Sequence, residues 1–172
     1  MNGLEDLIEK LKLGFSHKDT FLIAIDGIGG SGKSTVALKL AEAVGARIIA
    51  TDAFYSKDTE EHDVKKLHEA VLDAKNEPGI TIIEGIYSMN SNTRDLYDYK
   101  IWVECEPKVA LERGIKRSGE QEREIWTNVW QPNELTYVKA ENSSSYADLV
   151  LDTTKADLQS FHLADAIPEL GS

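Results

Sequence analysis

The feature that most constrains this chain is the stretch GIGGSGKST at residues 27–35, which directly follows the apolar run FLIAID. Residues 27–34 satisfy the pattern G-x-x-x-x-G-K-[ST] in full, with Gly27, Gly32, Lys33 and Ser34 at its fixed positions. Glycines let the backbone curl so that successive N–H groups point at phosphate oxygens, and a following helix adds the positive end of its dipole. The stretch therefore predicts a phosphate-binding loop between a buried strand and a helix.

Short apolar runs alternate with amphipathic segments along the rest of the chain. RIIAT, GITIIEG, YKIWVEC and ADLVLDT predict four further strands, and helices are expected at 3–13, 33–44, 59–75 (capped by Asp58), 107–117, 132–142 and in the tail SFHLADAIPEL. Near-continuously apolar strands joined by helices indicate an α/β fold with a parallel sheet covered on both faces. No linker or repeat divides the chain, so we expect one domain spanning residues 1–172.

Composition excludes several classes of partner. The formal net charge is −11, which argues against a surface that binds a nucleic-acid backbone. No run approaches the roughly 20 apolar residues of a membrane span, and the amphipathic start lacks the core of a signal peptide. The single cysteine, Cys105, is expected to be a small buried hydrophobe, and the histidines show no metal-ligand spacing. We expect a cytoplasmic protein, and the sequence leaves a homodimer open.

The loop residues take individual roles at a bound nucleotide. Lys33 is expected to reach the β- and γ-phosphates, Ser34 to place its hydroxyl on Mg²⁺, and Thr35 to contact a nearer phosphate. Glu84 ends the third strand beside the loop and is expected to hold the metal, directly or through water. The predicted nucleotide contacts are Gly27, Gly29, Gly30, Ser31, Gly32, Lys33, Ser34 and Thr35.

A carboxylate and a basic lid are expected around this loop. Asp52 follows the second strand in TDAFY, and parallel strands present their carboxyl ends to one crevice, so Asp52 could take a proton from a substrate hydroxyl. Arg113 and Arg117 are spaced i, i+4 on one helix face and could clamp the transferring phosphate. The lid is expected at about residues 113–131, and Arg123 is a third, less favoured candidate for a lid arginine.

The sequence leaves alternatives open for these lid residues. The arginines could instead form surface salt bridges with Glu112, Glu120 and Glu122. Trp126 and Trp130, also spaced i, i+4, could stack on a ligand ring or pack against each other. Gly114 and Gly119 are expected to loosen the segment for closure.

Other classes of nucleotide-binding protein fit less well. Residues 154–157 read TKAD after the fifth strand, which loosely matches the base-reading [NT]-K-x-D of GTPases, and Asp157 would be its reader. However, IIE is followed by GIYS rather than the D-x-x-G of a γ-phosphate sensor. A motor needs more chain, whereas a regulatory module that binds nucleotide without catalysis remains an alternative.

The segments IAIDGIGGSGKST, TDAFY, IIEGIYS, YDYKIWVECEPKVALERGIKR and ADLVLD, in this order, resemble the uridine kinase-like family of P-loop kinases, the group of phosphoribulokinase and uridine kinase. The stretch from Trp126 to Tyr137 also looks like bacterial members, and the resemblance covers roughly residues 20–152. It implies a five-stranded parallel sheet in the order 2-3-1-4-5, ATP with Mg²⁺ as donor, Asp52 as catalytic base and a mobile lid bearing arginines.

The expected activity is therefore transfer of the γ-phosphate of ATP to a hydroxyl of a nucleoside or nucleoside-like small molecule. Only about two dozen residues separate Tyr55 from GITIIEG, where uridine kinases carry a longer insert that shapes the nucleoside pocket. A kinase of another small alcohol, of vitamin or sugar type, is the alternative. The acceptor contacts are predicted at Tyr55, His62, Asp63 and Tyr87.

Overall fold

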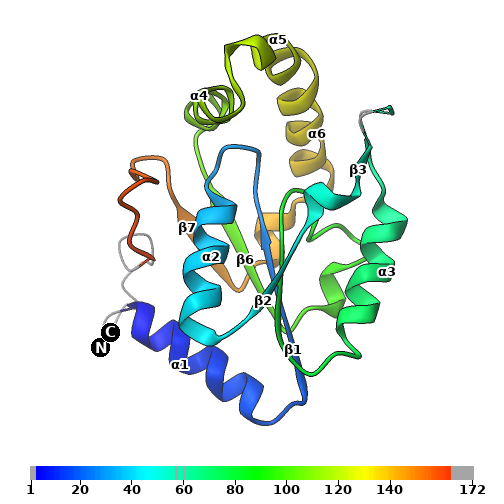
Figure 1. Ribbon diagram of the computed structural model, residues 1–172, viewed down its shortest axis with the longest axis vertical. Helices are drawn as coiled ribbons and strands as arrows, with labels where there is room; N and C mark the ends of the chain where they lie inside the picture. The colour runs from blue at the N-terminus through cyan, green and yellow to red at the C-terminus, as the bar shows by residue number, and fades with distance from the viewer. Residues whose placement is uncertain (1–2, 57, 60, 164–172) are drawn as a thin grey trace.

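The computed structural model describes residues 3–56, 58–59 and 61–163, and its centre is a five-stranded parallel sheet (Figure 1). The strand order is β2-β5-β1-β6-β7, which is the order that the family resemblance implies. The bounds of these strands are β1 Thr20–Asp26, β2 Arg47–Ala50, β5 Gly79–Glu84, β6 Tyr99–Glu104 and β7 Leu149–Asp152. Two short strands, β3 Tyr55–Ser56 and β4 Glu61–His62, form a separate antiparallel pair.

Helices cover both faces of the sheet and one of its ends. The longer helices are α1 Gly3–Ser16, α2 Lys33–Val44, α3 Val64–Ala74, α4 Pro107–Ser118 and α6 Gln131–Glu141. A short helix, α5 Arg123–Ile125, and a π turn at Trp126–Trp130 connect α4 to α6. Single 3₁₀ turns occur at Thr51–Phe54, Arg94–Leu96, Glu120–Glu122 and Ser143–Tyr146.

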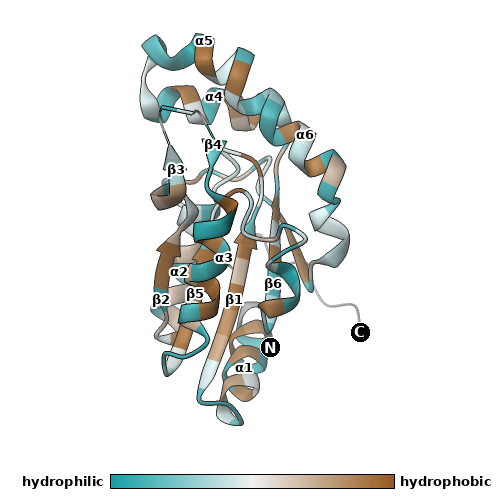
Figure 2. Cartoon of the chain, turned by 90° about the vertical axis from the view of Figure 1, so that its right-hand side faces the viewer, coloured by the Kyte–Doolittle hydropathy of each residue, from teal (hydrophilic) through white to brown (hydrophobic). Residues whose placement is uncertain are grey.

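Alternate residues of β1 belong to two separate cores, because successive side chains of a strand point to opposite faces of the sheet. Phe21, Ile23 and Ile25 pack with α1 and α2 on one face. Leu22 and Ala24 pack with α3 on the other face. Figure 2 shows the resulting apolar character along the central strands. Burial on both faces explains why these strands read as near-continuous apolar runs in the sequence.

Two predicted helix boundaries were wrong. The helix α1 continues past Gly14 to Ser16. The capping box at Asp58 does not form: Glu61 and His62 lie in β4, and α3 begins only at Val64. Because the hairpin needs its residues in extended backbone, the helix starts after it. The predicted helix in the tail lies largely outside the described residues.

The carboxyl ends of the sheet strands meet at one edge, where α4, α5 and α6 arch over the sheet (Figures 1 and 2). Asp26 ends β1, Glu84 ends β5, and Ala50, the register partner of Glu84, ends β2 just before Asp52. Parallel pairing therefore brings the phosphate loop, Asp52 and Glu84 to the same edge. In the part of the chain that is described, no helix has both the length and the apolar character to cross a membrane.

Packing of α2 on the sheet is testable with two leucines of the same helix. Leu40 is fully buried in the core, whereas Leu38 is 62% exposed. Leu40→Ala should lower the free energy of unfolding by about 2–5 kcal/mol, because it leaves a cavity beside the sheet. Leu38→Ala should change it by less than about 0.5 kcal/mol. Urea denaturation of both variants measures this, and equal losses would contradict the assigned faces.

Candidate active site

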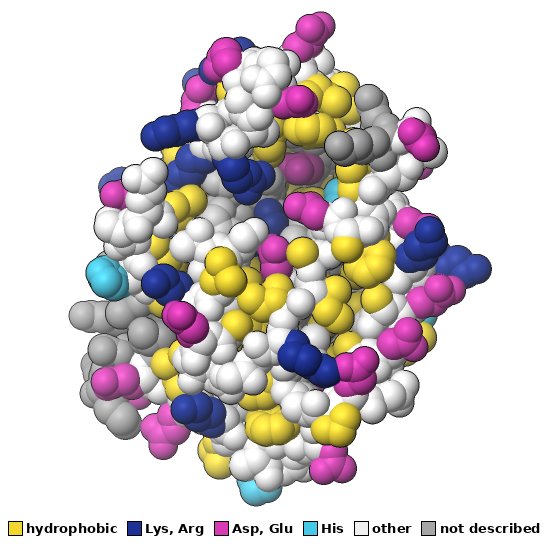
Figure 3. Space-filling view, viewed as in Figure 1, with side chains coloured by type: hydrophobic (Ala, Val, Ile, Leu, Met, Phe, Trp, Pro, Cys, Tyr) yellow, Lys and Arg dark blue, Asp and Glu magenta, His cyan; other side chains and the backbone are white. Residues whose placement is uncertain are grey.

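A cavity of about 960 Å³ opens at the carboxyl edge of the sheet, under the arch of α4–α6. The hollow is visible in the upper half of Figure 3. Its walls come from the phosphate loop, the segment after β2, the end of β5, the helices α4 and α6, and the segment after β7. The polar and aromatic lining includes Lys33, Ser34, Thr35, Asp52, Tyr55, His62, Glu84, Arg113, Lys116, Arg117, Trp126, Trp130, Glu134 and Asp157.

The phosphate loop is shaped by a backbone contact that only glycine permits. Gly30 has a φ of +80°, and a Cβ there would lie 1.9 Å from the carbonyl oxygen of Ala110 in α4. The next turn leads into α2 through Gly32 at φ +94°. Gly29, Gly30, Gly32 and residues 33–35 line the cavity, whereas Gly27 and Ser31 are buried behind it. The loop and the N-terminus of α2 thus border the cavity, although the Gly27, Gly29 and Ser31 N–H groups donate to other groups of the protein.

Lys33 is buried at the base of the cavity. Its Nζ donates to the carbonyl oxygen of Ile28 at 2.8 Å, so the side chain curls back over its own loop. Burial raises the pKa values of Glu84 and Glu134, and both carboxyls are close enough to Lys33 for its charge to oppose that rise. A phosphate group entering the loop would therefore meet a desolvated ammonium group.

Glu84 and Ser34 form a hydroxyl–carboxylate pair beside the loop. Ser34 Oγ donates to Glu84 Oε1 at 3.2 Å. Burial raises the pKa of Glu84, and Lys33 opposes this rise. Among the described residues no group of three or more His, Cys, Asp or Glu side chains could hold a metal ion. One hydroxyl and one carboxylate, with the remaining positions left to water and phosphate oxygens, is the donor set that suits Mg²⁺.

Asp52 lies on the 3₁₀ turn after β2 and projects into the cavity. Its side chain is 88% exposed, and its Oδ1 lies 4.0 Å from Nε2 of His62. Burial lowers the pKa of His62, so the imidazole next to Asp52 is neutral at pH 7. Asp52 is thus a free, solvated carboxylate within the cavity that also contains Lys33.

The two predicted lid arginines have different environments. Arg113 lines the cavity, and its Nη2 donates to the carbonyl oxygens of Thr153 at 2.9 Å and Ala156 at 2.7 Å. It holds the segment after β7 against α4. Arg117 also lines the cavity, and its charge partly opposes the rise that burial causes in the pKa values of Glu84 and Glu134. Lys116 of the same helix also lines the cavity.

Arg123 forms surface salt bridges, the alternative that the sequence left open for the lid arginines. Its guanidinium pairs with Glu112 at 2.8 Å and also with Glu120. The hydrogen bonds to these two carboxylates raise the pKa of Arg123. Arg123 is absent from the cavity lining and ties α4 to the turn before α5.

Trp126 packs between the phosphate loop and α4. Its ring fills the space beside two glycines: a Cβ on Gly29 or Gly114 would lie 2.6–2.8 Å from ring atoms. Its Nε1 donates to Ser118 Oγ at 2.8 Å. Gly114 therefore makes room for a tryptophan in this structure, which gives it a packing role that the sequence prediction of a loosened lid did not include. Trp126 and Trp130 pack edge to face, with centroids 5.2 Å apart.

Glu134 is a site residue that the sequence analysis missed. Its Oε2 accepts a hydrogen bond from the Gly29 N–H at 2.7 Å, so one loop amide already donates to a carboxylate of the protein. Burial raises its pKa, and Lys33 is the largest opposing influence. Nothing in the periodicity of α6 identifies this residue; the only signal was its place in the stretch from Trp126 to Tyr137 that carries the family resemblance.

Tyr137, one turn after Glu134, reaches the base of the loop. Its hydroxyl donates to Asp26 Oδ2 at 2.6 Å, and the N–H groups of Gly27 and Met89 donate to the same carboxylate. Burial raises the pKa of Asp26 to about 6, and the Tyr137 hydrogen bond is the largest opposing influence. The helix α6 is thus bonded to the loop at both Gly29 and Asp26.

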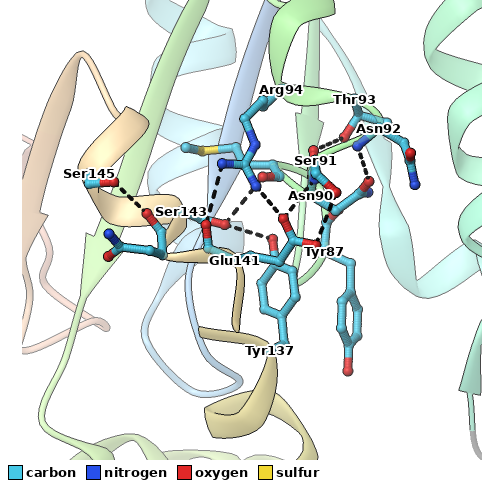
Figure 4. A network of polar contacts seen from close by, with 12 residues as sticks. Tyr87, Asn90, Ser91, Asn92, Thr93, Arg94, Tyr137, Glu141, Ser143 and Ser145 are labelled. Atoms are coloured by element: carbon cyan, nitrogen blue, oxygen red, sulfur yellow. Dashed lines mark hydrogen bonds and ion pairs between the residues drawn. The ribbon is translucent and has the colours of Figure 1, made fainter. Parts of the chain in front are cut away.

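A partly buried ion pair fixes the far end of α6 (Figure 4). Arg94 is only 7% exposed and pairs with Glu141, which also accepts from the Ser91 N–H at 2.8 Å. Ser143 Oγ lies 3.1 Å from the Tyr137 hydroxyl and donates to the Met89 carbonyl oxygen. The segment after β5 therefore supports α6 and, through it, the positions of Glu134 and Tyr137.

The four predicted acceptor contacts separate into three cases. Tyr55 and His62 line the cavity, with centroids 5.1 Å apart. Tyr87 lies just behind them: its ring is 4.8 Å from that of His62, and its backbone adopts φ 70°, which is unusual for a tyrosine. Asp63 is outside the cavity lining, and its carboxylate accepts from the Lys66 N–H at 3.0 Å and caps α3.

Sequence similarity to known kinases covers only part of this chain. A family model described as cytidylate kinase matches residues 23–84. Over 53 residues the chain is 45% identical to the bifunctional pantoate ligase/cytidylate kinase of Gloeobacter violaceus (strain ATCC 29082 / PCC 7421). The match covers 31% of this chain and 10% of that protein, so it spans a small fraction of the relative.

Solved structures match most of the chain. A possible uridine kinase from Bacillus stearothermophilus gives a TM-score of 0.59 at 16% identity, over 86% of this chain and 98% of the other. Shikimate kinase from Acinetobacter baumannii, in complex with shikimate, gives a TM-score of 0.63 at 14% identity, over 88% of this chain and 93% of the other. The chain has the P-loop kinase fold. The sheet order and the resemblance read from the sequence are confirmed at the level of this fold.

Within the P-loop kinase fold, the link between Tyr137 and Asp26 is testable. Because the Asp26 pKa is raised by burial, its stabilising contribution is greatest below about pH 4 and is lost as pH rises through about 6. Tyr137→Phe removes a donor to the carboxylate and should raise the Asp26 pKa further. Titration of the Asp26 carboxyl ¹³C shift measures this, with Tyr99→Phe as the control. An unchanged or lower pKa in Tyr137→Phe would rule out the assigned bond.

Proposed function

We propose that this protein is an ATP-dependent kinase that transfers the γ-phosphate to a hydroxyl of a small molecule, of nucleoside or nucleoside-like type. The observation that carries the proposal is Asp52, a solvated carboxylate that shares one cavity with Lys33 and the loop amides. A phosphate-binding loop alone suits many nucleotide-binding proteins. A free carboxylate across the same cavity suits transfer to an acceptor hydroxyl.

Each residue has a separate task in this reaction. The loop amides and the N-terminus of α2 bind the phosphates, and Lys33 leaves the Ile28 carbonyl oxygen to neutralise charge on the γ-phosphate. Asp52 orients the acceptor hydroxyl and accepts its proton as the oxygen attacks phosphorus. Arg117 stabilises negative charge that spreads over the transferring group. Arg113 acts indirectly, because it positions the segment after β7.

Ser34 and Glu84 would hold Mg²⁺, as their hydroxyl–carboxylate pair fits that ion. When bound, the ion supplies positive charge between phosphate oxygens. Ser34 would supply its hydroxyl oxygen and Glu84 a carboxylate oxygen to that ion.

A GTPase is less well supported. Asp157, the predicted base reader, lines the cavity, but its carboxylate accepts from the Gln159 N–H at 3.0 Å and from Ser160 Oγ at 2.9 Å. Both oxygens are thus engaged by its own turn.

The direct test is a screen for ADP release against nucleosides, vitamins and sugars, run with ATP and with GTP. At least one neutral or cationic alcohol should stimulate ADP release with ATP well above the rate without acceptor. Tight nucleotide binding with no stimulation by any acceptor would favour the regulatory alternative, and a preference for GTP that Asp157→Ala abolishes would favour a GTPase.

Two substitutions separate donor binding from transfer. Asp52→Asn should lower kcat by about 10²-fold or more, because the acceptor hydroxyl loses its base, while the affinity for Mg·ATP stays within about twofold. Lys33→Ala should instead weaken Mg·ATP binding by about tenfold or more, because a desolvated charge is removed. Calorimetry with Mg·ATP and initial rates measure the two effects.

The control for Asp52→Asn is Asp95→Asn, which removes the same charge at an exposed position outside the cavity lining. It should leave both quantities unchanged. Full activity in Asp52→Asn would refute the assignment of the base.

A further inference from the structure

The cavity has two halves of opposite character. The lysines and arginines among its described lining are Lys33 in the loop and Arg113, Lys116 and Arg117 on α4. The acceptor half, defined here as Asp52, Tyr55, His62, Trp130 and Glu134, contains no lysine or arginine. In Figure 3 blue side chains gather on the left of the hollow, and acidic, apolar and histidine side chains on its right.

Aromatic rings form a continuous wall in the acceptor half. The Trp130 and Trp126 centroids are 5.2 Å apart, and Trp130 meets Tyr55 edge to face at 6.4 Å. Trp130 Nε1 also donates to the Tyr55 hydroxyl at 3.0 Å, which fixes the two rings relative to each other. Tyr55 in turn contacts His62. Such a wall offers π faces and edges to a flat ligand and attracts cations.

The two carboxylates of this half lack a basic partner. Among the described residues, neither Asp52 nor Glu134 has a lysine or arginine nitrogen within 4.0 Å. The nearest basic side chain to Asp52 is His62, which burial keeps neutral at pH 7. The groups whose charges act on Glu134 are Lys33, Asp52 and Arg117.

Nucleotide binding would increase the excess of negative charge in the acceptor half. Lys33 and Arg117 face the phosphates, so their charge is neutralised by the nucleotide. A phosphate oxygen at the Gly29 N–H would also compete with Glu134 for that donor. The released carboxylate then faces the acceptor half with no cation of the protein to balance it, and a partly buried, unpaired carboxylate is unfavourable.

We propose that the acceptor is an alcohol that carries a positively charged ring or ammonium group, which Glu134 and the rings of Trp130 and Tyr55 recognise. This inference rests on the proposed function, since it names the acceptor class of that site. A cationic acceptor supplies the missing counter-charge to Glu134 and gains cation–π contact with the wall. An anionic acceptor meets two carboxylates and is rejected.

The test uses three ring compounds of similar size that differ in charge: benzyltrimethylammonium, benzyl alcohol and phenylacetate. Their binding to the full chain is followed at neutral pH, with Mg²⁺ and a saturating non-hydrolysable ATP analogue present, by quenching of tryptophan fluorescence. Trp126 and Trp130 line the cavity, whereas Trp102 is 2% exposed in β6 and gives a constant background. The cation should bind at least tenfold more tightly than the neutral alcohol, and phenylacetate should not saturate.

Glu134→Gln should reduce the preference for the cation over the neutral alcohol to less than about threefold while leaving the affinity for benzyl alcohol within twofold. The matched control is Glu124→Gln, which removes one charge from an exposed position of the same lid outside the cavity lining. It should keep the full preference. Unfolding of Glu134→Gln is checked by circular dichroism, and benzyl alcohol binding reports that the aromatic wall is intact.

Equal affinities for the cation and the neutral alcohol in the unaltered chain, or tightest binding of phenylacetate, would overturn the proposal. So would a preference for the cation that survives in Glu134→Gln. Because the analogue is not turned over, these outcomes are independent of the screen for ADP release. A failed screen with cation selectivity intact would refute the kinase proposal alone.

Discussion

The contact between Gly30 and the carbonyl oxygen of Ala110 couples the parts of this site. A Cβ at Gly30 has no room, so the phosphate loop lies directly against the backbone of α4. That helix carries Arg113 and Arg117 and, through Gly114, provides the surface on which Trp126 packs. The loop and lid are therefore one packed unit, and a change at either alters the other.

Charge organises the site within an acidic protein. The chain has a formal net charge of −11, yet Lys33 and the amides of the loop converge where the strands end. Glu84 and Asp26 lie in the same buried edge, and burial raises the pKa values of both. Positive groups are thus gathered locally, and the surrounding carboxyls accept hydrogen bonds from backbone N–H groups and hydroxyls.

The sequence predicted most of the fold because parallel strands buried on both faces leave an unmistakable apolar pattern, and the phosphate loop has a fixed motif. It also placed Lys33, Ser34, Asp52 and Glu84 at one edge by topology alone. The details it missed depend on tertiary contacts. Asp63, rather than Asp58, caps α3 because a hairpin intervenes.

The partners of side chains on α4 and α6 could not be predicted from the sequence either. Arg113 and Arg117 share a helix face, and only packing shows that carbonyl oxygens after β7 engage Arg113. Glu134 reads as an ordinary surface acid on a helix of mixed polarity, yet it bonds to the Gly29 N–H. Long-range contacts of this kind leave no periodic signal in the chain.

The fate of the γ-phosphate tests the central claim most directly. The protein is incubated with ATP labelled in the γ-phosphate and a set of small alcohols, and the label is followed by chromatography. The account predicts label in a phosphorylated alcohol, with formation of that product lost in Asp52→Asn. Label released only as inorganic phosphate, at a rate that no alcohol changes, would contradict it.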